Sequence, residues 1–143
     1  MGNPRLGVSK QGKDMHYSVG ALIERNGEYL LIDRAKPPLG FAGIAGHIDE
    51  EETPEKALLR EVGEESGLKV ESYKLIFEEE IGWNQCRRGI GTHYWYVFDC
   101  KASGQLRMNV EEANSIGWFS KEEMRNLKLE PIWGYWFKKL NLI

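Results

Sequence analysis

The stretch from Gly46 to Leu68 constrains this chain more than any other, because it places many acidic residues in a pattern that can also fold as a helix. Thr53 followed by Pro54 predicts a helix N-cap and the first helical residue, and Gly67 predicts the C-terminal stop. The predicted helix therefore has about three and a half turns.

One face of this helix is acidic. At about 100° per residue, Glu61, Glu64 and Glu65 fall within one arc. The neighbouring arc, which we expect to be buried, holds Leu58, Leu59 and Val62. Like charges at these spacings cost roughly 0.2–0.5 kcal/mol each. A divalent cation would reverse the sign of that repulsion, since clustered oxygen ligands suit Mg²⁺ or Mn²⁺. The alternative is a solvated acidic face without a ligand.

The wider spacing favours the metal interpretation. Gly46 is followed after five residues by Glu52, and after seven more by the run from Arg60 to Leu68, REVGEESGL. This resembles the signature of the Nudix hydrolases at each of its nine constrained positions within 23 residues. The resemblance implies an α/β fold, namely a Nudix-type α/β/α sandwich with a mixed β-sheet and a loop-helix-loop catalytic motif.

The resemblance also implies Mg²⁺- or Mn²⁺-dependent hydrolysis of a pyrophosphate bond in a nucleoside diphosphate linked to another group. By position, it implies catalytic roles for Glu61, Arg60, Glu64 and Glu52. It implies metal ligation by Glu61, Glu64, Glu65 and the Gly46 carbonyl. Arg60 resembles the residue that pairs with Glu52 and orients Glu61, and Glu61 could be a ligand or the base on the attacking water.

Two positions depart from the common family pattern. Many members have Pro-Gly-Gly where this chain has Ile44-Ala45-Gly46, and Gly-Glu where it has Glu51-Glu52. Neither change removes a catalytic carboxylate, so the departures concern the path of the loop.

A further metal ligand is expected from a glutamate before the last strand, as in many Nudix enzymes. Glu112 is the first candidate, with Glu111 as an alternative, and spacing alone does not choose between them. Glu79, at the end of an earlier strand, is a third possibility.

Substrate contacts are expected from two loops. The glycine-bounded segment Gly82–Gly91 carries an aromatic ring, an amide and two guanidinium groups that could stack a base and hold phosphate: Trp83, Asn84, Arg87 and Arg88. The alternative is a flexible hairpin tip with solvated arginines. Arg34 lies where many Nudix proteins have a basic residue near phosphate, and its alternative is an ordinary surface charge.

The 143 residues suit one domain, with residues 1–15 as a flexible N-terminal arm and 16–143 as the Nudix domain. Asn26-Gly27 predicts a hairpin between the strands Tyr17–Glu24 and Glu28–Asp33.

The later elements are predicted from shorter patterns. Lys69–Ile81 predicts a strand with Tyr73, Leu75 and Phe77 on its buried face, and Thr92–Cys100 predicts a central strand. On that strand His93 and Trp95 share one face and Tyr94 and Tyr96 share the other, so one of these pairs could form the floor of a pocket. A place in the core is the favoured interpretation of His93. Strand Ile116–Phe119, a capping-box helix at Ser120 and a helix from Pro131 follow, the last with an aromatic stripe expected in the core or a dimer contact.

Composition limits the partners. A net charge of −3 gives no field for gripping a long nucleic acid, so we expect a small-molecule nucleotide instead. The sequence shows neither a secretion signal nor an apolar run of 18 residues, which predicts a cytoplasmic protein without membrane contact. Cys86 and Cys100 are expected to be reduced. A homodimer is possible.

The substrate class stays open at this stage. Compact size and the Ile116–Phe119 ending favour a MutT-type nucleoside triphosphate pyrophosphohydrolase. ADP-ribose, nucleotide sugars and dinucleoside polyphosphates are the alternatives. A non-catalytic nucleotide-binding Nudix module is a further alternative, but its box is usually broken. A prenyl diphosphate isomerase would need a catalytic Cys partnered by Glu.

Overall fold

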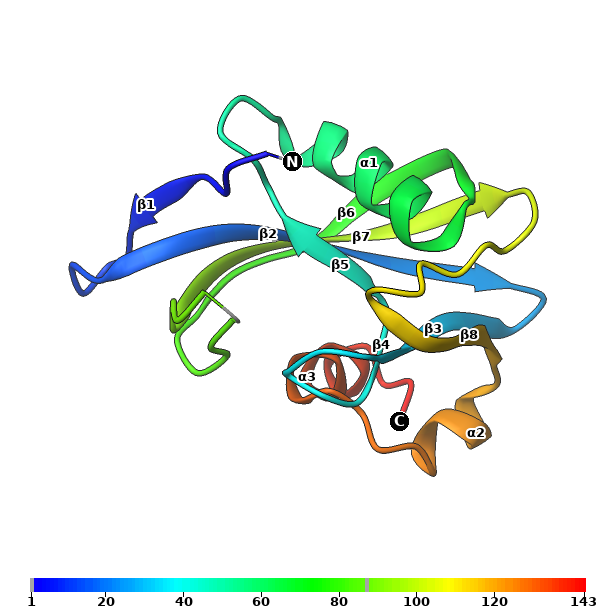
Figure 1. The fold of residues 1–143 in the computed structure, drawn as a ribbon. Coiled ribbons are helices and arrows are strands. Elements are labelled where there is room, and N and C mark those ends of the chain that lie inside the picture. The colour runs from blue at the N-terminus through cyan, green and yellow to red at the C-terminus, as the bar shows by residue number, and fades with distance from the viewer. Residues whose placement is uncertain (1, 87) are drawn as a thin grey trace.

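The computed structural model describes residues 2–86 and 88–143. Strand β2 (Asp14–Arg25) lies in the centre of the sheet and pairs with other strands along both of its edges (Figure 1). Along one edge, β7 (Thr92–Ser103) runs parallel to β2 from the Met15–Thr92 pair to the Ile23–Cys100 pair. Along the other edge, three antiparallel strands pair with β2 in succession: β1 (Leu6–Val8), β5 (Ile44–His47) and β3 (Glu28–Arg34).

The remaining strands extend the sheet at both sides. β6 (Lys69–Ile81) pairs with β7, while β3 also pairs with β4 (Phe41–Ala42) and β8 (Ala113–Phe119). Helix α1 (Pro54–Ser66) covers one face and α3 (Pro131–Lys139) the other, and the short α2 (Lys121–Arg125) follows β8 (Figure 1). The predicted mixed sheet between helices is confirmed.

The hairpin between β2 and β3 forms where Asn-Gly predicts it. Asn26 has φ 54° and Gly27 has φ 81°, so both central residues are left-handed. Two such residues make the turn whose twist matches that of the flanking strands.

Helix α1 has the predicted boundaries. The Thr53 side chain accepts a hydrogen bond from the Lys56 N–H at 3.2 Å. Gly67, at φ 74°, ends the helix in the left-handed conformation and donates its N–H to the Gly63 carbonyl at 3.0 Å. Side chain and backbone thus satisfy groups that a helix terminus would otherwise leave unpaired.

The buried arc of α1 differs from the predicted one. Leu58 is buried, but Leu59 is 45% exposed. The buried residues are Ala57, Leu58, Val62, Glu65 and Ser66. Compared with the predicted orientation, the helix is rotated about its axis. The arc that faces the sheet includes the acidic side chain of Glu65.

Helix α3 supplies much of the core on the opposite face. Trp136 stacks on Phe77 of β6 with ring centroids 5.6 Å apart, and it meets Trp95 of β7 edge-on at 6.0 Å. A Cβ at Gly20 of β2 would lie 3.1 Å from the Trp133 ring, so the absence of a side chain there gives this indole its space. The aromatic stripe is core within one chain and offers no support for a dimer.

Within the described part of the predicted flexible arm, residues 2–15, the chain pairs with the rest of the sheet. β1 pairs with the start of β2, the Arg5 N–H donates to the Ile48 carbonyl at 2.8 Å, and the Glu50 N–H donates to the Asn3 carbonyl at 2.9 Å. Pairing with an open sheet edge uses the backbone N–H and C=O groups, and every residue except proline has both. The lack of hydrophobic periodicity therefore did not indicate disorder.

The predicted buried face of β6 is also wrong. Tyr73 is 45% exposed and Leu75 is 40% exposed, whereas Phe77 packs against the core. β6 has only one neighbouring strand, and its register with β7 shifts between Leu75 and Phe77. A bulge moves the following side chains to the other face, so strict alternation does not hold across it.

The predicted central strand Thr92–Cys100 is longer than expected and continues to Ser103. Within residues 2–86 and 88–143, helices are too short and too polar to cross a bilayer.

Adjacent leucines on α1 test the observed burial. We expect Leu58→Ala to lower the free energy of unfolding by about 2–5 kcal/mol, since a fully buried leucine is lost and a cavity remains. Leu59→Ala, the matched control, should change it by less than about 1 kcal/mol. Chemical denaturation monitored by circular dichroism measures both, and equal losses would contradict the orientation of the helix.

Candidate active site

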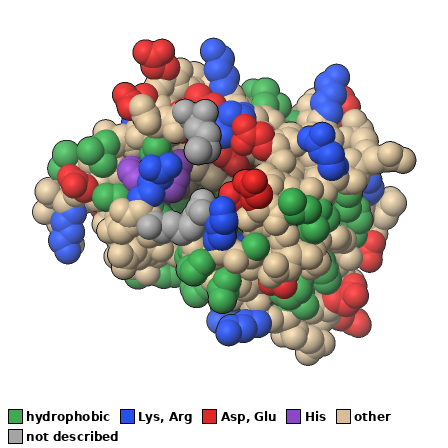
Figure 2. Space-filling view, viewed as in Figure 1, with side chains coloured by type: hydrophobic (Ala, Val, Ile, Leu, Met, Phe, Trp, Pro, Cys, Tyr) green, Lys and Arg blue, Asp and Glu red, His purple; other side chains and the backbone are tan. Residues whose placement is uncertain are grey.

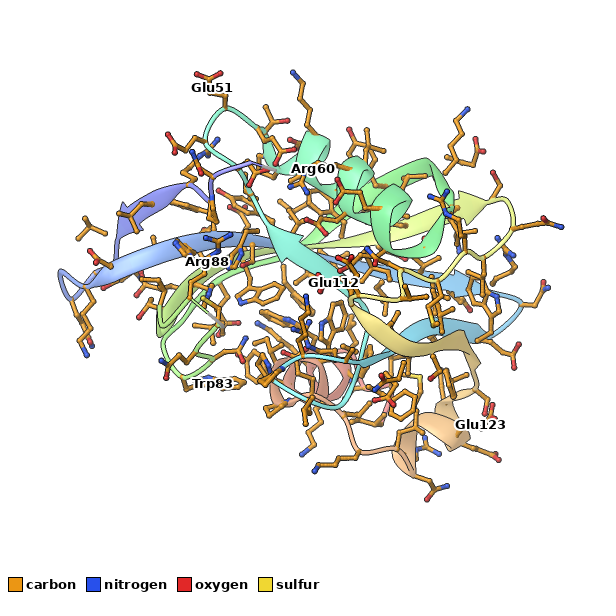
Figure 3. All side chains as sticks on the ribbon, viewed as in Figure 1. Glu51, Arg60, Trp83, Arg88, Glu112 and Glu123 are labelled. Carbon is orange, nitrogen blue, oxygen red and sulfur yellow. The ribbon has the colours of Figure 1, made fainter. Side chains whose placement is uncertain are left out.

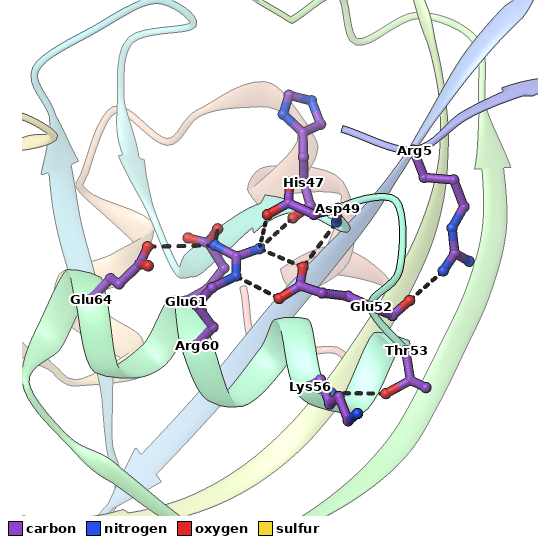
Figure 4. Close-up of polar contacts among 9 residues, drawn as sticks. All are labelled: Arg5, His47, Asp49, Glu52, Thr53, Lys56, Arg60, Glu61 and Glu64. Atoms are coloured by element: carbon purple, nitrogen blue, oxygen red, sulfur yellow. Dashed lines mark hydrogen bonds and ion pairs between the residues drawn. The ribbon is translucent and has the colours of Figure 1, made fainter. Parts of the chain in front are cut away.

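The Arg60 guanidinium joins the acidic groups of the loop and helix (Figure 4). Its Nε and Nη2 contact the two oxygens of Glu52 at 2.6 and 2.8 Å. Nη1 donates to Glu61 Oε1 at 2.7 Å and approaches Glu64 Oε2 at 3.4 Å, while Nη2 also donates to the His47 carbonyl at 2.9 Å. One side chain of α1 is thereby fixed to β5 and to the loop between them.

Glu52 completes this arrangement from the loop side. Besides Arg60, it accepts a hydrogen bond from the Asp49 N–H at 2.9 Å, and its own carbonyl accepts one from Arg5. The hydrogen bond from Arg60 is the main reason that the pKa of Glu52 is lowered. Glu52 is therefore a carboxylate that holds Arg60 in place, and it does not line the neighbouring cavity.

Gly46 of β5 lies directly against Glu61. A Cβ at this position would be 2.2 Å from the carboxyl carbon of Glu61, a separation that no side chain tolerates. Glycine thus allows the Glu61 carboxylate to lie against the strand backbone. Gly63, in contrast, has open space where its Cβ would be, so packing does not require it.

Two carboxyl groups on α1 have raised pKa values. Burial raises the pKa of Glu61 to about 7, although the nearby Arg60 opposes the shift. Burial also raises the pKa of Glu65 well above its usual value, and the charges of Glu61 and Glu112 add to this effect. Both groups are therefore costly to ionise without a compensating positive charge.

The geometry of these carboxylates fits a divalent cation. Glu65 Oε2 is buried without a hydrogen-bond partner among the described residues. Glu61 and Glu64 are turned toward Arg60, whose positive charge is the nearest one available to them. Among the described residues, these three carboxylates are not gathered closely enough to hold a metal ion as they stand. A cation between them would offset their mutual repulsion. Mg²⁺ or Mn²⁺ prefers oxygen ligands and would stabilise these carboxylates, one of which is buried without a partner.

A cavity of about 420 Å³ lies beside these groups and is lined by most of the predicted site residues. The predicted site residues that line it are Arg34, Gly46, Arg60, Glu61, Glu64, Glu65, Asn84, Arg88 and Glu112. Acidic side chains border one side of this region, and histidine and basic side chains the other (Figure 2). The structure therefore brings the Nudix box and both substrate-contact loops together.

Trp83 does not lie where the sequence predicts. It is 53% exposed and meets Tyr135 of α3 edge-on at 5.7 Å, outside the cavity (Figure 3). Trp95 lines the cavity instead, next to His93 on β7, as the shared face of that strand predicts. Arg87 lies outside the described residues.

Three glutamates were alternatives for a further ligand, and their positions differ. Glu112 lines the cavity, and its charge contributes to the raised pKa of Glu65. Glu111 is exposed and outside the cavity lining. Glu79 accepts hydrogen bonds from Tyr135 at 2.5 Å and Lys139 at 2.6 Å, also away from the cavity. Among the three, Glu112 is the one near the box.

Arg34 is not an ordinary surface charge. Only 18% of its side chain is exposed, and Nε donates to the Pro38 carbonyl at 2.7 Å. It also lies 4.0 Å from the carboxylate of Glu130, whose pKa is raised to about 7 by burial. No sequence pattern indicated Glu130, because it precedes α3 and reaches the cavity only through the fold.

Other cavity residues were also missed. Asp49 lies 3.4 Å from Arg60, and Asn109 lines the cavity. His47 and Cys86 also line the cavity with His93, and His16 lies close to them. In the sequence, His93 lies in a predicted strand and His16 beside one, but His47 lies in the segment before the predicted helix. No sequence pattern therefore brings the three histidines together.

Comparison with known proteins agrees with this geometry. The model of the NUDIX domain matches residues 14–140. A MutT-like protein of Streptomyces ambofaciens is 33% identical over 107 residues, covering 73% of this chain but only 63% of that protein. The CTP pyrophosphohydrolase of Escherichia coli (strain K12) is 31% identical over 120 residues, covering 79% of this chain and 82% of that protein.

A solved structure shows the same fold at low identity. The NUDIX domain of Shewanella oneidensis NrtR, complexed with ADP ribose, superimposes with a TM-score of 0.73, covering 87% of this chain and 85% of that chain. At 14% identity this likeness concerns the fold alone. With a complete box on α1, a cavity beside it and a domain match over nearly the whole chain, the protein belongs to the Nudix hydrolase family.

Proposed function

We propose that the protein hydrolyses a pyrophosphate bond of a small nucleotide in a reaction that requires Mg²⁺ or Mn²⁺, with nucleoside triphosphates as the preferred class. The observation that carries this proposal is the unpartnered carboxylate oxygen of buried Glu65, which lines the same cavity as Glu61, Arg34 and Arg88. Anionic oxygens for a cation and guanidinium groups for phosphate thus lie around one space.

The metal would be held by oxygens that line the cavity: Glu61, Glu64, Glu65, Glu112 and the Gly46 carbonyl. When bound, Mg²⁺ supplies neutralisation of phosphoryl charge and increases the acidity of a water molecule. Glu65 would gain the charge partner that its buried oxygen lacks. Glu112 reaches the site from the loop before β8, so its position depends on the sheet and not on the helix.

Glu61 has the properties of a proton acceptor. Its pKa of about 7 lies near neutral pH, where a general base is most effective. Arg60 fixes its carboxylate at 2.7 Å and is itself held by Glu52, so Arg60 and Glu52 are positioning residues. The same positioning by Arg60 would serve Glu61 whether it binds the metal or accepts a proton from water.

Substrate phosphates would be held by Arg34 and Arg88, and Asn84 offers a polar group on the same loop as Arg88. Trp95 replaces Trp83 as the aromatic side chain available at the cavity floor. Its ring is largely buried against Trp136, which fixes its orientation. A small nucleotide fits a cavity of about 420 Å³, whereas a long nucleic acid would need an extended basic surface.

The free thiols bear on two further points. Cys100 is fully buried with a pKa raised to about 12 by burial, and Cys86 lies beside His16 at 3.9 Å. Neither arrangement places a cysteine beside a glutamate, so an isomerase mechanism has no support. Two unpaired cysteines also favour a reducing compartment, and we propose a cytoplasmic location.

A panel of nucleotides tests the substrate class. Because two relatives are named a MutT-like protein and a CTP pyrophosphohydrolase, we expect the highest kcat/KM with a nucleoside triphosphate, and pyrophosphate and a monophosphate as products. ADP-ribose, nucleotide sugars and dinucleoside polyphosphates form the comparison set. Phosphorus NMR of the products identifies the bond that breaks, and a higher kcat/KM in the comparison set would reassign the substrate.

Replacing a candidate ligand tests the chemistry. Glu64→Gln should reduce turnover by roughly 100-fold or more, since even groups that only support metal ligands cost about 10- to 100-fold. Glu64 is 56% exposed in its side chain, so the fold should persist. The matched control is Glu55→Gln, an exposed carboxylate on the same helix outside the cavity.

Steady-state kinetics with saturating Mg²⁺ and circular dichroism distinguish the outcomes. Normal turnover in Glu64→Gln would exclude this carboxylate from the metal site. An equal loss in Glu55→Gln would show that net charge, and not ligation, controls the rate.

The raised pKa of Glu61 predicts a pH-dependent effect of Mg²⁺. The folded pKa of about 7 exceeds the unfolded value of 4.5, so stability contributed by the protonated group is complete below about pH 4.5 and is lost as pH rises through about 7. Mg²⁺ binds the ionised group, so its stabilising effect should increase over that window and level off above it.

Thermal denaturation at pH 5, 6, 7 and 8, with EDTA or with Mg²⁺, measures this difference. In Glu61→Gln the pH dependence of the Mg²⁺ effect should shrink. Glu130→Gln is the control, because Glu130 has a similarly raised pKa but is no candidate ligand. Equal stabilisation by Mg²⁺ at pH 5 and pH 8 would show that Glu61 does not control uptake.

A further inference from the structure

All three histidines of the chain and one of its two cysteines lie together, and His47, Cys86 and His93 of this group line the cavity. They are His16, His47, Cys86 and His93, and their ligand atoms all lie within 4.8 Å of one another. Among the described residues, this is the group of His, Cys, Asp and Glu side chains gathered closely enough to hold a metal ion as it stands. The Nudix box uses none of them.

The sheet itself brings the imidazoles together. His16 of β2 and His93 of β7 are directly paired on parallel strands, so both side chains point to the same face. His47 of β5 pairs with Ser18, two residues beyond His16, and therefore shares that face. The ring centroids of His47 lie 4.8 Å from His16 and 5.7 Å from His93.

The fourth group comes from the loop between β6 and β7. Cys86 Sγ lies 3.9 Å from His16 Nδ1. Its backbone is held by a tight turn, in which Cys86 N–H donates to Ile90 and Gly89 N–H donates to Cys86, both at 3.0 Å. In a tetrahedral site with bonds of roughly 2.0 Å to nitrogen and 2.3 Å to one sulfur, ligand atoms are about 3.3–3.5 Å apart. Rotamer adjustments would therefore bring these atoms to bonding distance.

His93 has a buried ring nitrogen without a hydrogen-bond partner among the described residues. The side chain is 2% exposed, and the unpartnered atom is Nδ1. The imidazole does make a backbone hydrogen bond with Asn84. Since Nδ1 has no partner, that bond belongs to the other nitrogen. A ring held by a carbonyl at one nitrogen and free at the other is the arrangement found in metal-binding histidines.

The charge state of the histidines suits ligation. Burial lowers the pKa of His93 to about 4 and is also the main cause of the lowered pKa of His16, to which the Arg88 charge adds. Both rings are thus neutral at pH 7 and carry a free lone pair. Arg88 would repel a cation, but a Cys86 thiolate formed on binding would supply a compensating negative charge.

This group is separate from the carboxylates because β5 divides them. Gly46 faces Glu61 on the side of α1, and His47, one residue later, points to the other face. The His47 carbonyl faces Arg60 while its ring points away from the glutamates (Figure 4). Hard oxygen ligands therefore lie on one side of the strand, and imidazole and thiol ligands on the other.

We propose that His16, His47, Cys86 and His93 form a second metal site, which binds one Zn²⁺ or a similar borderline-soft divalent ion. Imidazole and thiolate donors select such ions over Mg²⁺, so the two sites would not compete for the same metal. On binding, the Cys86 thiol releases its proton to solvent and the thiolate sulfur bonds to the metal. Three ligands belong to the sheet, so the metal would tie the β6–β7 loop to it. That loop also carries Asn84 and Arg88 at the cavity.

Cobalt substitution tests the site without relying on enzymatic activity. Tag-free protein is stripped with a chelator and titrated with Co²⁺ while the absorption spectrum is recorded. We expect one Co²⁺ per chain, visible bands of a tetrahedral ion and a near-ultraviolet band from thiolate-to-metal charge transfer. Zn²⁺ should displace the Co²⁺, and excess Mg²⁺ should not.

Two variants locate the metal. Cys86→Ser should abolish the charge-transfer band and weaken Zn²⁺ binding by at least about 10-fold in competition with a chromophoric chelator. Glu64→Gln is the control, and it should retain the full Co²⁺ spectrum because Glu64 lies on the other side of β5. An unchanged Zn²⁺ affinity in Cys86→Ser, or wild-type Co²⁺ spectra without a thiolate band, would overturn the proposal. Loss of the spectrum in Glu64→Gln would show that cobalt occupies the carboxylate site instead.

Discussion

The guanidinium of Arg60 is the interaction on which the acidic half of the site depends. Without it, Asp49, Glu52, Glu61 and Glu64 would be negative charges in a small, partly buried space. Arg60 offsets this repulsion, and it also donates to the His47 carbonyl, so that α1, the preceding loop and β5 form one unit. The acidic groups can therefore be placed close together before any metal binds. A lysine would lack the planar, multidirectional donors that reach all these partners.

Glycine at position 46 is the second constraint, because it sets how close helix and strand can come. The Glu61 carboxylate occupies the space where any other residue would have its Cβ. This contact places an ionisable group against the backbone in a region of low solvent access, and burial then raises its pKa. The lack of a side chain at Gly46 on β5 thus contributes to the raised pKa of Glu61 on α1.

Much of this site follows from local sequence. The caps of α1, the Asn-Gly hairpin and the spacing of the box depend on residues near one another, and each was confirmed in the structure. What the sequence could not provide depends on distant pairing. The face of Tyr73 changes at a bulge set by β7, and residues 6–8 become a strand because β2 has an open edge. The histidine and cysteine group requires three strands and a loop to meet.

The same reasoning explains the error on α1. Helical periodicity correctly grouped the side chains by angle, but it could not say which arc faces the sheet. Leucine at position 59 suggested burial by its type, whereas the fold buries Glu65. A carboxylate was therefore placed in a position that hydrophobicity alone would assign to a leucine. Such an exchange costs stability, and it lies in the part of the helix for which we propose a role in metal binding.

The ordered N-terminal segment has a practical consequence for anyone who prepares this protein. Gly2 and Pro4 line the cavity, and a Cβ at Gly2 would touch Asp49. A polyhistidine tag attached close to Gly2 would bring foreign imidazoles near the cavity. The other terminus lies beyond α3, on the opposite side of the sheet from α1 (Figure 1). A cleavable purification handle placed there would leave the entrance unobstructed.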